Sequence, residues 1–170
     1  MFSIDELKNA LSRMSETEII YDADDEKSSR LKFRKNGELF VIYSLPENEL
    51  SKTNLRLSRL VKLNKNKSMS KDDCEAIEAS LNLTSSTPCK VVYVYNLNGS
   101  DLDSGFFITN VYSDKLDFFE KDQDEKTRIS NAVILILGMI VEVISCNQEI
   151  VVMVDETAEK TAKAGEKDGE

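Results

Sequence analysis

The chain has 170 residues and a mass of 19.2 kDa, with 41% apolar and 31% charged residues, which is the size and composition of a globular domain. Its formal net charge of −9 disfavours general binding to nucleic acid or to an anionic bilayer. The sequence contains no histidine, which excludes Ser-His-Asp and Cys-His catalysis and imidazole zinc sites.

The cysteines indicate a reducing compartment. Cys74, Cys89 and Cys146 are odd in number and widely spaced, a pattern typical of buried free thiols rather than of a disulfide framework. The N-terminal segment is amphipathic and carries acids, unlike a secretory signal. The most apolar run, residues 132–144, is too short to cross a bilayer and contains Glu142. We therefore expect a soluble, cytoplasmic protein.

The first element is predicted to be a helix over residues 3–14. Ser3 is a suitable N-cap and Glu6 follows it by three positions, which is the spacing of a capping box. Apolar residues then recur at helical spacing. They are Ile4, Leu7, Ala10, Leu11 and Met14.

Three β-strands are predicted next. Residues 18–21 form the first, followed by an acidic turn at 22–26. Residues 31–35 alternate apolar and basic side chains, with the two-residue period of a half-buried strand. Asn36-Gly37 is a strong hairpin signal because both central residues of a type I′ turn need positive φ. The returning strand covers residues 39–45 and stops at Pro46.

Residues 51–71 differ from their surroundings because they hold seven Lys and Arg side chains and no acid. Leu57, Leu60 and Val61 have the spacing of an apolar helical stripe, so we predict a short helix starting near Thr53. A further helix is predicted from Ser70 as N-cap to about residue 81.

A second pair of strands follows, over residues 90–97 and 106–112, which are rich in Val, Tyr and Phe. We expect one core across an antiparallel sheet. Its predicted members are Leu31, Phe33, Phe40, Ile42, Val92, Val94, Phe107 and Val111.

The last long helix is predicted to start at Asp124 or Thr127 and to reach Ile144. Because this segment is apolar nearly all round and rich in β-branched residues, two buried strands meeting at Gly138 are an alternative. Residues 149–154 are interpreted as a final strand. The sequence thus predicts one α+β domain over residues 1–154 and a disordered charged tail over 155–170.

The predicted order is helix, three-stranded meander, helix, strand pair, helix. With the small size and acidic pI, it resembles the type III secretion chaperone fold, shared by class I effector chaperones and YbjN-like regulators. The YbjN-like resemblance rests on an Asn-containing segment that leads into a strand pair and a final apolar helix. Its segments are Ala79-Ser80-Leu81-Asn82-Leu83-Thr84, Lys90-Val91-Val92-Tyr93-Val94-Tyr95 and Phe106-Phe107-Ile108-Thr109.

The resemblance covers about residues 3–146 and implies a non-enzymatic, usually dimeric protein that binds other proteins. It carries over no functional residue. The leading hypothesis is a protein-binding module, either chaperone-like or a YbjN-like regulator, that holds a partner polypeptide along its sheet. Strands 31–35 and 39–45 are the expected edges or apolar grooves for an extended segment.

The alternative hypothesis is a sensor that binds an anion or nucleotide through the basic segment. Its candidate residues are Arg56, Arg59, Lys62 and Lys65. The competing interpretation is that these charges neutralise acidic faces of the protein's own fold or of a dimer mate. Aromatic residues interleaved with the bases, typical of nucleic-acid binding, are missing from this segment, so nucleic acid is not an expected partner.

No enzymatic motif is present. Asp101 and Asp103 lie in a polar connector but lack the further ligands of a calcium loop, and no two carboxylates have a spacing that pairs them. We expect no catalytic residue, metal or cofactor.

The final helix predicts self-association. A helix that is apolar all round has more apolar surface than one small sheet can cover. Because Glu142 marks the solvent edge, the expected dimer interface lies on Ile134, Leu137 and Val141.

Overall fold

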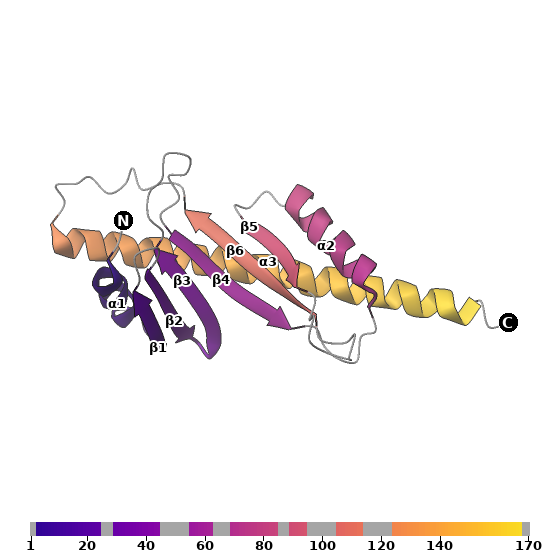
Figure 1. Cartoon of the computed structure of the whole chain (residues 1–170), viewed down its shortest axis with the longest axis horizontal. Coiled ribbons are helices and arrows are strands. Elements are labelled where there is room, and N and C mark those ends of the chain that lie inside the picture. The colour runs from indigo at the N-terminus through magenta and orange to yellow at the C-terminus, as the bar shows by residue number, and fades with distance from the viewer. Residues whose placement is uncertain are drawn as a thin grey trace. The chain divides into compact units, whose positions relative to one another are not determined.

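The computed structural model describes residues 3–24, 29–44, 55–62, 69–84, 89–94, 105–113 and 124–167. It has the predicted α+β class: a six-stranded antiparallel sheet that does not close, with three helices (Figure 1). The elements are α1 (Ile4–Ser12), β1 (Thr17–Asp24), β2 (Ser29–Lys35), β3 (Glu38–Ser44), β4 (Leu55–Lys62), α2 (Lys71–Thr84), β5 (Cys89–Val94), β6 (Phe106–Ser113) and α3 (Glu125–Lys167).

The strand order in the sheet is β1-β2-β3-β4-β6-β5, so β1 and β5 are the edge strands. The chain divides into two compact units. Unit 1 comprises Met1–Arg59 and Asn110–Val143, and unit 2 comprises Leu60–Thr109 and Ile144–Glu170. The two units are described separately.

In unit 1, α1 begins with the predicted capping box. The Ser3 hydroxyl accepts a hydrogen bond from the Glu6 N–H at 3.1 Å, and the Glu6 carboxylate accepts one from the Ser3 N–H at 2.8 Å. Two of the N–H groups that a helix start leaves unpaired are therefore satisfied. Leu7, Ala10 and Leu11 are fully buried, as their spacing predicts.

The β2–β3 hairpin also forms as predicted. Asn36 and Gly37 have φ values of 50° and 81°, which the type I′ turn requires at both positions. The turn sets Phe33 opposite Phe40, and their rings stack with centroids 5.5 Å apart. Leu31 and Ile42 form the next inward pair, and all four of these predicted core residues are buried.

The helix predicted near Thr53 is wrong, because residues 55–62 form strand β4. Leu55 and Leu57 are fully buried and lie opposite Ser44 and Ile42 of β3. The two-residue alternation of these leucines matches the pleat of β3, and strand pairing satisfies backbone groups of β3 that β2 leaves unpaired. This tertiary pairing overrides the helical spacing of Leu57, Leu60 and Val61.

In unit 2, α2 starts after Ser70, as predicted. The Ser70 hydroxyl accepts a hydrogen bond from the Asp73 N–H, and the Asp73 carboxylate accepts bonds from the Ser70 N–H and hydroxyl. Cys74, Ile77 and Leu81 form the buried stripe of this helix.

The second strand pair forms, but the predicted phase of β5 is wrong. Val92 is 42% exposed and Val94 is half-buried, whereas Cys89 and Val91 are buried. Both faces of this strand carry apolar side chains, so period-2 alternation gave no information about which face points inward. In β6 the predicted core residues Phe107 and Val111 are buried.

Helix α3 runs without interruption over 43 residues, so the helical interpretation of the segment around Gly138 is correct. The final strand predicted at 149–154 is wrong, and residues 155–167 continue the helix where a disordered tail is expected. No proline occurs after Pro88, so nothing stops helix propagation past Ile144. The helix is also long and apolar enough to cross a membrane, a criterion that core helices of soluble proteins meet as well. The length argument from residues 132–144 alone therefore fails.

Candidate functional site

Arg56 and Arg59, two of the four basic residues predicted to bind an anion, do not converge. The Arg56 guanidinium lies 3.9 Å from the ring centroid of Tyr43, its partner in the β3–β4 register. Arg59 forms an ion pair with Glu38 and lies 5.7 Å from the ring centroid of Phe40. Since Phe40 belongs to the core face and Tyr43 to the outward face, the two arginines project from opposite faces of the sheet.

The other two candidates are Lys62 and Lys65. Lys62 is exposed at the end of β4, in unit 2, and Lys65 lies outside the described residues. The Glu38 carboxylate neutralises Arg59 within the protein's own fold.

In unit 1, the side chains on the outward face of β3 and β4 are more exposed to solvent than those on the inward face. Leu39 is exposed, and Val41, Tyr43 and Arg56 are half-buried. On the inward face of the same strands, Phe40, Ile42, Leu55 and Leu57 are buried. The Nε atom of Arg56 is buried and has no hydrogen-bond partner among the described residues. The Arg56 guanidinium stacks on the Tyr43 ring, a cation–π contact that positions this side chain.

Edge strand β5 is closed by side chains from α2, which lies beside it (Figure 1). Asn82 accepts a hydrogen bond from the Val91 N–H at 2.9 Å and donates one to the Val91 carbonyl at 2.8 Å. Glu78 accepts a hydrogen bond from the Tyr93 N–H at 2.9 Å. The side chains of a helix thus replace a neighbouring strand at this edge.

For edge strand β1, the hydrogen-bonding directions of the backbone follow from the strand register. In the described part of the chain its ladder runs to β2 on one side, with a bulge between Ile19 and Tyr21. In a two-residue hairpin the pair beside the turn, here Lys35 and Glu38, exchanges both hydrogen bonds. Alternation along β2 then directs the N–H groups of every second residue toward β1.

This alternation shows which backbone groups of β1 point outward. Lys32 directs its backbone groups toward β1, opposite Tyr21, so these two residues form a hydrogen-bonded pair. Asp22 follows Tyr21 and therefore directs its N–H and C=O away from β2. Within the described part of the chain, no strand pairs with β1 on that side.

A second uncovered surface lies on α3. The three residues predicted for a dimer interface are exposed: Ile134 by 70%, Leu137 by 39% and Val141 by 62%. Gly138 lies among them, and a Cβ atom built at this glycine meets nothing within 4 Å. We call Ile134, Leu137, Gly138 and Val141 the α3 face.

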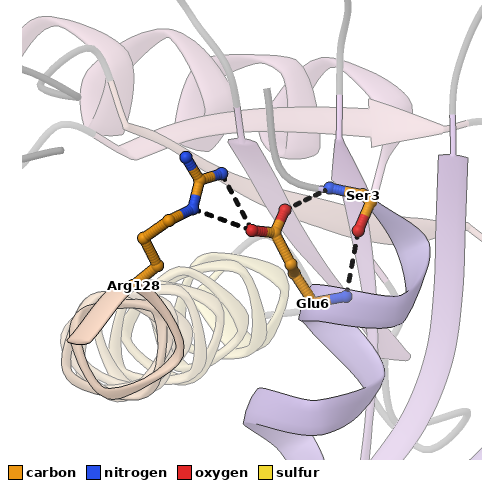
Figure 2. Close-up of polar contacts among 3 residues, drawn as sticks. All are labelled: Ser3, Glu6 and Arg128. Atoms are coloured by element: carbon orange, nitrogen blue, oxygen red, sulfur yellow. Dashed lines mark hydrogen bonds and ion pairs between the residues drawn. The ribbon is translucent and has the colours of Figure 1, made fainter. Parts of the chain in front are cut away.

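The start of α3 is tied to α1 by a polar cluster, shown in Figure 2. The Arg128 Nε donates a hydrogen bond to Oε1 of Glu6 at 2.8 Å, and a terminal guanidinium nitrogen forms an ion pair with the same oxygen at 2.8 Å. Burial alone would raise the pKa of Glu6, but hydrogen bonds from Ser3 and the charge of Arg128 outweigh it and lower that pKa. The cluster fixes α1 in place, and sequence patterns missed it because its partners are 122 residues apart.

The described residues offer little for chemistry. They contain no group of three or more Cys, Asp or Glu side chains that could hold a metal ion. All three cysteines are buried, and burial raises the pKa of the Cys74 thiol, so its reactive thiolate is disfavoured.

Comparisons with known proteins place the chain in no group: no family model, no curated protein and no solved structure matches it.

Proposed function

We propose that this chain is a non-enzymatic protein-binding module, secretion-chaperone-like or YbjN-like, that holds an extended segment of a partner polypeptide along β1. The observation that carries this proposal is the difference between the two sheet edges. The outward backbone groups of β5 are bonded to Asn82 and Glu78, whereas β1 directs the N–H and C=O of Asp22 outward. An extended chain that adds to such an edge gains main-chain hydrogen bonds whatever its sequence.

The location differs from the one that the sequence predicts. Strands 31–35 and 39–45 are β2 and β3, which lie inside the sheet with a neighbour on each side and have no unpaired edge. Ile20, at the bulge of β1, is 41% exposed and offers an apolar contact beside the edge. Main-chain bonds would therefore supply affinity, and contacts such as this one would supply specificity.

The experiment selects binders from a displayed library of random, unstructured peptides, and measures their binding to two variants. Asp22→Pro removes the outward N–H, and Asp22→Asn removes the same charge but keeps that N–H. We expect Asp22→Pro to abolish binding and Asp22→Asn to retain it, with unchanged melting temperature in both. A selected peptide that binds Asp22→Pro as well as the wild type would contradict strand addition at β1.

An anion or nucleotide sensor has weaker support. Arg59 is paired with Glu38, and Arg56 projects from the opposite face of the sheet. Salt separates the two functions, because anion binding falls steeply as salt rises, whereas strand addition depends little on it. Titration with inorganic phosphate and with a nucleoside triphosphate at low salt tests the sensor directly.

A further inference from the structure

We propose that the α3 face pairs with the same face of a second copy of the chain, with the two helices antiparallel and a twofold axis passing between Leu137 and Gly138. This inference is independent of peptide binding at β1. It rests on three features of unit 1: the exposed apolar side chains, the glycine among them and the way these groups complement themselves.

The exposed side chains form one continuous stripe. Ile134, Leu137 and Val141 are spaced by three and four residues, so they lie on one side of a helix with 3.6 residues per turn. The opposite side of the same segment is buried in the protein's own core, through Ala132, Ile136 and Val143. The protein's own core therefore accounts for one side of this segment and leaves the stripe unexplained.

Gly138 has no explanation within its own chain. A glycine inside a helix is destabilising by about 0.5–1 kcal/mol relative to alanine. Its φ is negative, and a methyl group at this position would enter open space. Among the described residues, neither backbone conformation nor packing therefore requires glycine here. A glycine on an exposed apolar helix face instead permits close approach of another backbone.

The stripe complements itself, which identifies the occupant as a second copy. Leu137 projects beside the gap left by Gly138, so a twofold axis between them sets each Leu137 over the partner's Gly138. The same axis sets Ile134 opposite the partner's Val141. The exposed residues of the stripe carry no charge, so two chains of net charge −9 would meet at a neutral surface.

The first test is the mass of the full chain by sedimentation equilibrium at micromolar concentration. We expect about twice 19.2 kDa for the wild type and a single chain for Leu137→Glu. The matched control is Leu83→Glu, because Leu83 is 85% exposed on α2 and should leave the dimer intact. A wild-type monomer, or a dimer that survives Leu137→Glu, overturns the proposal.

A second variant separates the interface from folding. Gly138→Ala should leave the melting temperature of the monomeric Leu137→Glu background unchanged or raised, because alanine favours a helix. In the wild-type background it should raise the dimer dissociation constant roughly tenfold, because the added methyl group keeps the backbones apart. A dimer unaffected by Gly138→Ala overturns the close approach.

Orientation is tested by disulfide trapping. Ile134→Cys mixed with Val141→Cys should form a crosslinked heterodimer, and neither variant should crosslink alone. Crosslinking of each variant with itself would instead indicate parallel helices and overturn the proposed antiparallel arrangement. Co-sedimentation of a monomeric wild type with phosphatidylcholine vesicles would assign the α3 face to a bilayer and overturn the proposal entirely.

Discussion

The two edges of the sheet solve the same problem in different ways. An edge strand exposes unpaired backbone N–H and C=O groups, which can pair with another chain. At β5, two side chains of α2 bond to these groups, Asn82 to both backbone groups of Val91 and Glu78 to the N–H of Tyr93. At β1, the described residues contain a bulge and an exposed isoleucine but no equivalent side chains.

In the proposed function, this difference keeps the β1 edge available for a partner segment while the β5 edge is closed. Closing β5 with hydrogen bonds from its own helix removes one of two sites for strand addition. The bulge in β1 increases the local twist, which disfavours pairing with the flat edge of another sheet. Selective availability of β1 is the physical basis of the proposed peptide binding.

The largest expected effect on this comparison comes from Phe33→Ala. Phe33 is fully buried, stacks on Phe40 and lies opposite Ile19 of β1, so it supports the β1 edge from the core. We expect a loss of about 3–5 kcal/mol in the free energy of unfolding, measured by urea denaturation. Hydrogen exchange should accelerate in β1 more than in β5, because unit 1 loses its packing.

The control is Phe33→Leu, which preserves more of the side-chain volume and should cost less than about half as much. An unchanged free energy of unfolding for Phe33→Ala would remove β2 from the core. Equal acceleration of exchange in β1 and β5 would show that the two edges open together, and would remove the distinction between them.

A smaller effect is expected at the closed edge. Asn82→Ala deletes two hydrogen bonds to Val91 and leaves its N–H and C=O unsatisfied, so the unfolding free energy should fall by about 2 kcal/mol. The variant should also self-associate, because its β5 edge then exposes unpaired backbone groups. Light scattering against concentration measures this gain, and hydrogen exchange of the Val91 amide locates it.

The matched variant is Glu78→Gln, which keeps an acceptor for the Tyr93 N–H. It should change stability by less than about 0.5 kcal/mol and leave β5 closed. If Asn82→Ala stays monomeric at every concentration at which the wild type does, side-chain closure is not what protects β5.

Local patterns predicted the elements whose signals are complete within a few residues. The capping box at Ser3, the Asn36-Gly37 turn and the cap at Ser70 each specify a backbone geometry by themselves, and all three form. Their consequences, such as the Phe33–Phe40 pair, followed from the register of the turn.

Elements that depend on distant partners were not predictable in this way. Residues 55–62 have both helical and strand spacing, and only pairing with β3 decides for a strand. The apolar residues of β5 occupy both faces, so the sequence could not indicate that Val91 rather than Val92 is buried. The run at 149–154 is rich in Val and Ile, yet it continues a helix that nothing before it stops.

The same distinction between local signals and distant partners applies to the candidate site. The sequence predicted a dimer interface on Ile134, Leu137 and Val141, which stays a prediction; their helical spacing is a local property, and all three side chains are exposed. It did not predict the closure of β5, although Asn82 near the end of a helix and before a Val-rich strand is a weak signal of it. The sequence also could not indicate that Arg56 and Arg59 lie on opposite faces of the sheet, because it did not predict that β4 is a strand.

The smallest expected effect concerns the helix that supports β1, and it depends on pH. Glu6 in α1 accepts hydrogen bonds from Ser3 and Arg128, and its pKa is lowered from the ordinary value of 4.5 (Figure 2). Because the folded-state pKa lies below the unfolded one, this stabilisation is fully present above about pH 4.5 and is lost as the pH falls through the folded-state value.

Glu6→Gln should therefore lower the unfolding free energy by about 1 kcal/mol at pH 7, an amount that exposure of the pair to solvent keeps modest. The difference between the variant and the wild type should shrink as the pH falls below 4.5 and through the lowered pKa of the folded wild type, where the Glu6 carboxylate becomes protonated. Urea denaturation at pH 7 and at pH 3 measures both values. A difference that stays constant between these two pH values would mean that Glu6 acts through packing rather than through its charge, and that acid does not weaken the support of β1.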